Sequence, residues 1–289
     1  MSLIITNIQR MCMQDGPGIR TTVFLKGCTL HCPWCANPEN IRCGRQYYFK
    51  EDICSANRGK SVFCAACPGE TILKYSYADK TKFSCPFGAI GVYGKSYKTQ
   101  ELVNLLLRDK AYWKETGGIT FSGGEPLLQA QELKRVLMLL KESNIHIVLE
   151  TALHVPIDAV KTVSEYVDLL FVDLKILDEQ ECKKILGGQA DLFKNNVRHL
   201  AATEKKVIFR IPCSNEFTLK DSNSKLLKEF IHQYNCYPVE IFSLHNFANS
   251  KYRTLGLYPP SEFPVDLCKM ERLATWINET GGKASVISI

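Results

Sequence analysis

The feature that most constrains the fold is a regular alternation of strand-like and helix-like segments over the last two thirds of the chain. Short apolar runs such as residues 145–151 and 206–213 alternate with longer segments such as 100–113 and 127–144, in which apolar residues recur at helical spacing. We count about six strand–helix units and one further strand. This pattern predicts an α/β protein whose parallel sheet is open or closed into a barrel.

Residues 36–98 interrupt this regularity. They hold six of the twelve tyrosines and five of the thirteen cysteines, with no sustained helical period. Such a short irregular segment predicts a small unit that a metal must organise. We therefore expect a main domain of residues 1–35 and 99–289, and a Cys-rich insertion of residues 36–98.

Charge and cysteine usage narrow the class of protein. Between Asn40 and Lys98 the chain holds ten Lys and Arg against four Asp and Glu, which accounts for the whole net charge of +6. This basic patch suits an acidic protein or a nucleic acid, or it offsets an anionic metal cluster. No apolar run approaches the roughly 20 residues that span a bilayer, and the N-terminus lacks a signal peptide. We expect a cytoplasmic protein whose odd number of cysteines favours metal binding over disulfides.

The sharpest motif is C-x3-C-x2-C at Cys28, Cys32 and Cys35, directly after a strand expected over residues 18–27. Three thiolates on one short loop can hold three irons of a cubane cluster and leave the fourth iron open. Structural zinc prefers four protein ligands, and His31 is an awkward fourth because it adjoins Cys32. The motif favours an iron–sulfur cluster, with zinc or plain structural cysteines as the alternative.

This motif resembles the signature of the radical S-adenosylmethionine (SAM) superfamily, with Trp34 in the aromatic position before the last cysteine. The surrounding stretch, DGPGIRTTVFLKGCTLHCPWCANPE, is similar to the start of glycyl-radical-enzyme activating enzymes, the group that contains pyruvate formate-lyase activase. GGITFSGGEPLLQ at 117–129 resembles the second hallmark of that group. The similarity covers about residues 6–39 and 99–289.

The resemblance implies a partial (β/α)6 TIM-type barrel of the radical SAM type with a ferredoxin-like insertion. It implies a radical SAM oxidoreductase whose [4Fe–4S] cluster on Cys28, Cys32 and Cys35 cleaves SAM to methionine and a 5′-deoxyadenosyl radical. That radical takes the α-hydrogen of a glycine on a partner glycyl radical enzyme. A flavodoxin or ferredoxin is the expected electron donor. We expect a monomer, with neither a nucleic acid nor a membrane as partner.

The loops after two strands carry further residues that the resemblance places at SAM. Gly123 and Gly124 let the backbone approach a ligand closely. Glu125 is either a carboxylate that orients the ligand or a surface acid. Glu150 stands where related activases have an acidic residue near the methionyl group of SAM.

Asp173 and Lys175 end the strand expected over residues 168–177 and resemble the D-x-K motif with which family members bind SAM. At a spacing of two, both side chains point to the same side of the strand. The resemblance gives Lys175 a part in shaping the active site. The alternative is an ion pair that only caps the strand.

Two late elements complete the expected SAM site. Arg210 lies in a stretch similar to the family's Arg-x-Pro strand and is expected at the carboxylate or ribose of SAM. His245 opens a stretch that resembles the H-x-x-G-x-x-K-Y element and is expected beside SAM. In that stretch Lys251 and Tyr252 match, whereas Ala248 replaces the glycine.

The insertion carries a second cysteine group, Cys54, Cys64, Cys67 and Cys85. Its last cysteine precedes a proline, and CPFGAI resembles the end of a bacterial ferredoxin motif. Related insertions carry two compact C-x2-C-x2-C-x3-C-P runs, which this sequence lacks. We expect one auxiliary [4Fe–4S] cluster on these four residues, with a zinc site or free thiols as alternatives.

The loops after Glu150 and Arg210 depart from the family pattern. These departures keep open a radical SAM enzyme that acts on another peptide or a small molecule. A non-catalytic iron–sulfur carrier or sensor is the third hypothesis, although the retained strand-end residues would have no purpose in it. The sequence assigns no role to Cys12, Cys43 or His154.

Overall fold

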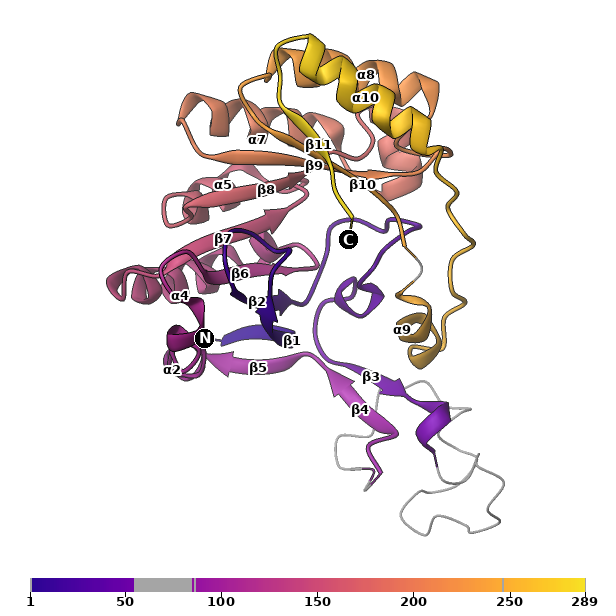
Figure 1. Ribbon diagram of the computed structural model, residues 1–289. Coiled ribbons are helices and arrows are strands. Elements are labelled where there is room, and N and C mark those ends of the chain that lie inside the picture. The colour runs from indigo at the N-terminus through magenta and orange to yellow at the C-terminus, as the bar shows by residue number, and fades with distance from the viewer. Residues whose placement is uncertain (1, 55–84, 86, 246, 289) are drawn as a thin grey trace.

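The computed structural model describes residues 2–54, 85, 87–245 and 247–288. Its centre is a nine-stranded sheet in the order β11-β10-β9-β8-β7-β6-β2-β1-β5 (Figure 1). The strands of this sheet are β1 (Ser2–Cys12), β2 (Arg20–Leu25), β5 (Lys95–Lys98), β6 (Gly118–Gly123), β7 (His146–Thr151), β8 (Leu169–Asp173), β9 (Val207–Cys213), β10 (Val239–Ser243) and β11 (Ala284–Val286).

The predicted α/β architecture is confirmed. The strands β2 and β6 to β10 are parallel and form the six expected strands of a partial barrel, and β11 adds a seventh parallel strand. Strand β1 runs antiparallel to both β2 and β5. In the described part of the chain, β5 and β11 form the two edges of the sheet.

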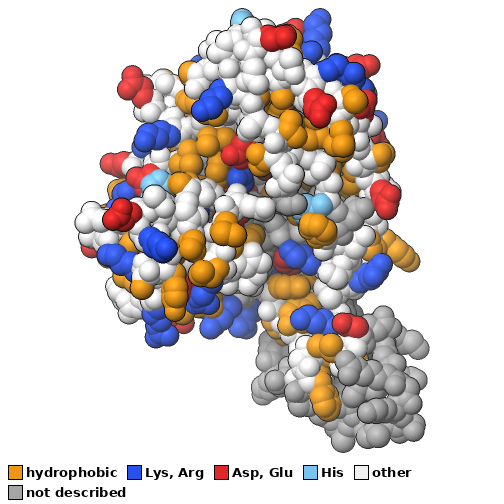
Figure 2. Space-filling model, viewed as in Figure 1, with side chains coloured by type: hydrophobic (Ala, Val, Ile, Leu, Met, Phe, Trp, Pro, Cys, Tyr) orange, Lys and Arg blue, Asp and Glu red, His pale blue; other side chains and the backbone are white. Residues whose placement is uncertain are grey.

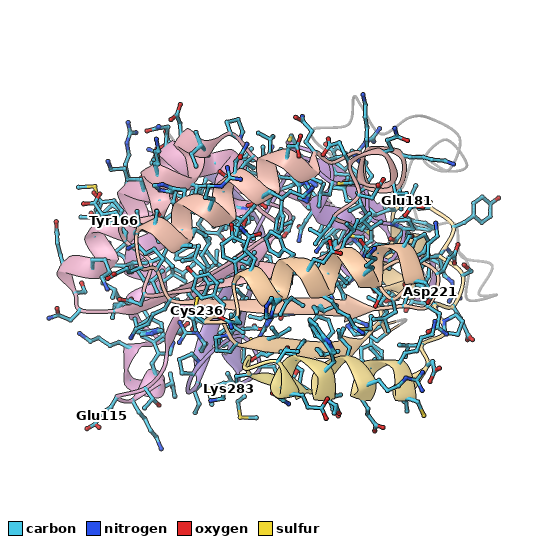
Figure 3. All side chains as sticks on the ribbon, turned by 90° about the horizontal axis from the view of Figure 1, so that it is seen from above. Glu115, Tyr166, Glu181, Asp221, Cys236 and Lys283 are labelled. Atoms are coloured by element: carbon cyan, nitrogen blue, oxygen red, sulfur yellow. The ribbon has the colours of Figure 1, made fainter. Side chains whose placement is uncertain are left out.

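Helices connect the parallel strands and cover one face of the sheet. The helices are η1 (Pro38–Asn40), η2 (Glu51–Ile53), α2 (Thr99–Leu107), α3 (Lys110–Trp113), η3 (Pro126–Gln129), α4 (Ala130–Glu142), α5 (Ile157–Ser164), α6 (Glu179–Glu181), η4 (Cys182–Leu186), α7 (Ala190–Ala202), α8 (Asp221–Gln233), α9 (Asn249–Thr254) and α10 (Leu267–Glu279). Seen from above, α7, α8 and α10 lie side by side over the strands (Figure 3). None of the helices in the described ranges is both long and apolar enough to cross a membrane.

The helical periodicity has the packing role that the sequence predicts. In α4, Leu133, Val136, Leu137 and Leu140 recur every three or four positions and are fully buried. One apolar stripe of the helix therefore packs into the core while its other residues stay hydrated. Burial of these stripes against apolar strands supplies the main stabilising term of the fold.

Two elements differ from the sequence prediction. The helix expected over 100–113 is divided into α2 and α3, because the carboxylate of Asp109 turns inward and accepts hydrogen bonds from Arg10 Nε at 2.9 Å and Thr21 Oγ1 at 3.0 Å. The sequence also missed β1, the longest strand. Its second half is polar and partly exposed, so it lacks the apolar alternation that marks a strand.

The described part of the insertion is an antiparallel ribbon of β3 (Gln46–Phe49) and β4 (Ile90–Tyr93). The ribbon projects from the body of the molecule (Figure 1). Its two ends meet, since the carbonyl oxygen of Gly44 lies 3.1 Å from the position that a Cβ on Gly94 would take. The last residues of the expected 36–98 insertion form β5 and pair with β1, so this strand lies in the main sheet.

Candidate functional site

A cavity, here called the barrel cavity, opens at the carboxyl ends of the parallel strands. Acidic, basic and histidine side chains gather near the middle of this face (Figure 2). The predicted residues that line the barrel cavity are Cys28, Cys32, Trp34, Cys35, Gly123, Gly124, Glu150, Asp173, Lys175, Arg210 and His245. Of the residues predicted for the main domain's site, Glu125 alone does not line it. Six strand ends and their loops thus converge on one space.

The cysteine loop, residues 28–35, follows β2 and is held by main-chain contacts. Gly27 N donates to Asn40 O at 2.8 Å, and Cys28 N donates to Ile41 O at 3.0 Å. The chain after the loop therefore folds back against the chain before it. This closure fixes both ends of the loop that carries the three thiols.

A π-helix supports the middle of the cysteine loop. At the end of η4, the carbonyl of Leu186 accepts from His31 N at 2.8 Å. Gly188 packs so closely that a Cβ there would lie 2.9 Å from His154 Nδ1, and this nitrogen accepts from Gln189 N at 3.1 Å. Burial lowers the pKa of His154 to about 4, so the neutral ring is the acceptor. The structure thus gives His154 a role that the sequence did not, and short π-helices often mark functional sites.

The three thiols suit a multi-iron group better than a single ion. Burial raises the pKa of Cys28 and Cys32 to about 12 and that of Cys35 to about 11. In the described residues, no three His, Cys, Asp or Glu side chains converge as a single metal ion would require. Zinc needs all its sulfur ligands about 2.3 Å away. A cubane instead takes one thiolate per iron, and three spaced thiols along one cavity wall fit that arrangement.

The two glycines after β6 bring their loop against the cysteine loop. A Cβ on Gly124 would lie 2.1 Å from the carbonyl oxygen of Gly27, and Glu125 N donates to that same oxygen at 2.7 Å. The close backbone approach predicted for these glycines is therefore made to the cysteine loop. Only a residue without a Cβ fits at position 124.

Glu125 is fully buried, so the alternative of a surface acid is wrong. Its carboxylate accepts from Thr151 Oγ1 at 2.8 Å, from Ala152 N at 3.0 Å and from Leu127 N at 3.2 Å. Burial raises its pKa to about 7, although these donors oppose the shift. The side chain joins the loop after β6 to the end of β7, behind the wall of the barrel cavity.

Asp173 and Lys175 form the ion pair that the sequence allowed, and both also line the barrel cavity. Lys175 Nζ lies 2.5 Å from Asp173 Oδ2, and the lysine side chain is only 10% exposed. Burial lowers the pKa of Lys175, but the charges of Asp173 and of a Cys32 thiolate outweigh it and raise the pKa above its ordinary value. A fixed cation therefore lies beside the thiols.

Arg210 donates from each of its three side-chain nitrogens to a protein group. Its guanidinium donates to Glu150 Oε1 at 2.5 Å, to Glu240 Oε2 at 2.8 Å and to Gln14 O at 2.8 Å. It also lies 3.5 Å over the ring of Phe171. Burial raises the pKa of Glu150, with Arg210 as the main opposing influence. The sequence missed Glu240, whose only signal is a single acid within the apolar run of β10.

The radical SAM superfamily matches residues 22–221, more than half of the chain. The protein belongs to the radical SAM superfamily. Membership in this family brings a [4Fe–4S] cluster and SAM as cofactors. The glycyl-radical-enzyme activating enzymes are the group within the superfamily that its relatives represent.

Two relatives illustrate this grouping. The 4-hydroxyphenylacetate decarboxylase activating enzyme of Clostridioides difficile (strain 630) is 33% identical over 273 residues, which cover 88% of this chain and 85% of the relative. The (2S)-3-sulfopropanediol dehydratase activating enzyme of Klebsiella oxytoca is 31% identical over 300 residues, or 96% of this chain and 95% of that one.

A solved structure gives the same fold. The crystal structure of QueE from Escherichia coli matches with a TM-score of 0.52 at 13% identity, over 100% of this chain and 95% of that chain. At this identity the likeness supports the radical SAM fold and nothing about the substrate.

The second cysteine group of this radical SAM protein is only partly described. Cys54 and Cys85 are half-buried, while Cys64 and Cys67 lie outside the described residues. Burial tends to raise the pKa of Cys85, but hydrogen bonds from the backbone N–H groups of residues 87–90 outweigh it and lower the pKa. A concave row of amides of this kind stabilises an anion.

Proposed function

We propose that this protein activates a glycyl radical enzyme by removing the α-hydrogen of a glycine on that partner. The observation that carries the proposal is the meeting of three thiols with strand-end charges in the barrel cavity of a radical SAM chain. The relatives' names support the choice of partner, since they are activating enzymes of a decarboxylase and of a dehydratase.

In this proposal Cys28, Cys32 and Cys35 hold three irons of the cluster. The bound cluster supplies the electron that splits SAM into methionine and the 5′-deoxyadenosyl radical that takes up the hydrogen. The protein fixes the position of its cofactors and excludes water. Trp34, only 7% exposed, packs behind the cysteine loop with its ring centroid 4.9 Å from that of Phe217.

The charged residues divide the recognition of SAM between them. Lys175, held by Asp173, offers its ammonium to the carboxylate of SAM, while Glu150 offers its carboxylate to the amino group. Arg210 orients Glu150, because its own donors are engaged by Glu150, Glu240 and the β1–β2 loop. Gly123, Gly124 and His245 also line the same cavity. Glu125 stabilises that lining from the protein interior, where its carboxylate accepts a hydrogen bond from Ala152 N.

The proposal extends to the insertion. One auxiliary [4Fe–4S] cluster on Cys54, Cys64, Cys67 and Cys85 would be helped by the amides that lower the pKa of Cys85. The positive charge of residues 36–98 suits an acidic flavodoxin or ferredoxin as electron donor. We place the enzyme in the cytoplasm as a monomer.

The test is reductive cleavage of SAM followed by transfer to a partner. Anaerobically reconstituted protein is reduced chemically in the presence of SAM, and the 5′-deoxyadenosine formed is quantified. Electron paramagnetic resonance then records whether 4-hydroxyphenylacetate decarboxylase or (2S)-3-sulfopropanediol dehydratase gains a glycyl radical. Cleavage without a radical on either enzyme favours another substrate, whereas the absence of cleavage contradicts the proposal altogether.

A Cys32→Ser variant serves as the negative arm and Cys236→Ser as its matched control. Cys236 is exposed just beyond the end of α8, at the other end of that helix from Asp221 (Figure 3), and it does not line the barrel cavity. Loss of SAM cleavage in the first variant alone is expected, because only Cys32 is a proposed iron ligand.

A further inference from the structure

The short helix α9 contacts the chain immediately after the cysteine loop. Lys251 Nζ donates to Asn37 Oδ1 at 2.6 Å and to Ala36 O at 3.2 Å. The same ammonium lies 2.8 Å from Glu39 Oε1. One side chain therefore contacts three of the four residues that follow the last cysteine. In Figure 1, α9 and η1 lie together beyond the carboxyl ends of the strands.

The next residue of α9 reaches the last cysteine itself. The hydroxyl of Tyr252 donates to Cys35 O at 3.1 Å, and its side chain is only 9% exposed. Adjacent residues of one helical turn thus hold the main chain from Cys35 onward. A buried hydroxyl in this position has little freedom to change partner.

Glu39 makes this contact rigid. Its side chain is 7% exposed, and its second carboxylate oxygen has no hydrogen-bond partner in the described structure. In the described residues Lys251 is the cation that forms an ion pair with this buried carboxylate, although Lys26 also interacts with it electrostatically, and such a pair is costly to break from one side. Lys26, directly after β2, also donates from Nζ to the main-chain oxygen of Glu39, so residues from two parts of the chain hold Glu39.

We propose that Lys251 and Tyr252 are positioning residues that fix the main chain behind Cys35 and so keep the third iron ligand in place. This assignment rests on the proposed cluster at the cysteine loop. It adds a second element to the cluster's support, since α9 starts four residues after His245 in the cavity wall. The wall of the barrel cavity and the third ligand are thereby joined through one short helix.

The decisive variant is Lys251→Met, which keeps the aliphatic stem and removes the ammonium. Outer contacts of metal ligands typically change metal affinity 10- to 100-fold, so iron loss to a chelator is expected to become about tenfold faster. The spectrum of the reduced cluster should also respond abnormally to SAM. Lys251→Arg keeps a donor for these acceptors and should restore slow iron loss. Tyr252→Phe, which loses one hydrogen bond, should have a smaller effect in the same direction.

Lys141→Met is the matched control. Lys141 is 36% exposed, as is Lys251, and its ion pair with Asp168 has the same length of 2.8 Å. Lys141 lies on α4, and its partner Asp168 bonds to Ile147 N at the beginning of β7, the opposite end from the cysteine loop. This control removes a lysine of equal exposure from an ion pair of equal length, but its partner is 33% exposed against 7% for Glu39, so the free energy of unfolding is measured for both variants. Iron loss from the control should stay at the wild-type rate.

The outcomes separate this inference from the proposed function. A wild-type protein without a cluster would defeat the proposed function. A wild-type protein with a cluster and a Lys251→Met variant that keeps its iron equally well would overturn this inference alone. If iron loss becomes faster by the same factor in Lys251→Met and Lys141→Met, the inference is also overturned, because the effect then comes from a general loss of stability. If Lys251→Met does not fold, the rate of iron loss from Tyr252→Phe to the chelator is the deciding measurement. A rate equal to that of the wild type would then count against the inference.

Discussion

The cysteine loop and the cysteines of the insertion differ in what surrounds their sulfur atoms. Burial raises the pKa of all three thiols in the cysteine loop. The opposite direction holds for Cys85, where backbone N–H groups lower the pKa. The loop is also joined to η1, η4 and α9, whereas Cys54 and Cys85 lie at the outer end of the ribbon, after β3 and before β4.

The contrast shows two ways of preparing a cysteine for iron. The main fold positions the cysteine loop in advance and leaves its thiols protonated, so cluster insertion must release protons there. In the insertion, the backbone N–H groups of residues 87–90 favour the thiolate of Cys85. We therefore expect the first site to depend on the fold and the second to depend on its own metal.

The largest expected effect comes from removing one cysteine of each group. Cys32→Ala should abolish SAM cleavage, because one of the three irons that the cysteine loop would hold loses its thiolate ligand. Cys85→Ala should remove about four irons yet leave the cysteine loop able to cleave SAM with a chemical reductant. Iron and sulfide analysis with 5′-deoxyadenosine measurement checks both. Loss of SAM cleavage in Cys85→Ala would show that the cysteine loop depends on the insertion, which would contradict the comparison drawn above.

A smaller effect is expected from glycines in the two regions. Gly124→Ala would place a Cβ 2.1 Å from a carbonyl of Gly27, and such overpacking typically lowers the free energy of unfolding by about 1–3 kcal/mol. It should also slow cluster incorporation at the cysteine loop.

Gly88→Ala is the counterpart in the insertion. Its Cβ meets no atom of the described residues within 4 Å, and its φ of +69° costs a residue with a side chain about 1 kcal/mol. Urea denaturation of both apoproteins gives the comparison. Equal costs, together with normal iron at the cysteine loop of Gly124→Ala, would show that the two loops are not packed as described.

The smallest effect concerns His154, which packs against the residues that follow η4 and stacks on Phe193. Its pKa is lowered from 6.5 to about 4, so the unfolded chain binds a proton that the folded chain does not as pH falls. The stability that this group contributes is complete above about pH 6.5 and is lost towards pH 4. Between pH 7 and 5.5 the loss is about 1 kcal/mol.

His154→Asn should reduce that loss, because the amide oxygen can accept from Gln189 N and does not titrate. Denaturant midpoints at the two pH values measure it, with the exposed His232→Asn as control. If the denaturant midpoint of His154→Asn depends on pH as much as that of the wild type, His154 does not make the contribution to stability described here.

The sequence predicted the fold class and half of the residues that line the barrel cavity. The strand–helix alternation is a local signal, and the motifs stand at the ends of strands, where a parallel sheet gathers them. The sequence failed where partners are distant along the chain. Arg210 meets Gln14 across 196 positions, and Tyr252 meets Cys35 across 217. Periodicity carries no information on such contacts.

Other misses come from single polar residues whose direction is set by packing. Asp109 divides a helix because its carboxylate faces inward, and Glu125 is buried although its motif suggested a ligand or a surface position. The π-helix η4 likewise depends on His154 and the cysteine loop beside it. Its local sequence contains no distinctive signal except the two following glycines.

The meeting of Gly44 with Gly94 bears on how this protein can be engineered and how its relatives diversify. The chain leaves the main domain at Gly44 and rejoins it at Gly94, and these two residues lie side by side. The segment between them can therefore be exchanged as a unit. A short linker that joins Gly44 to Gly94 should leave the pairing of β1 with β5 intact. Insertions of very different lengths can therefore be exchanged there while the barrel keeps its strand order.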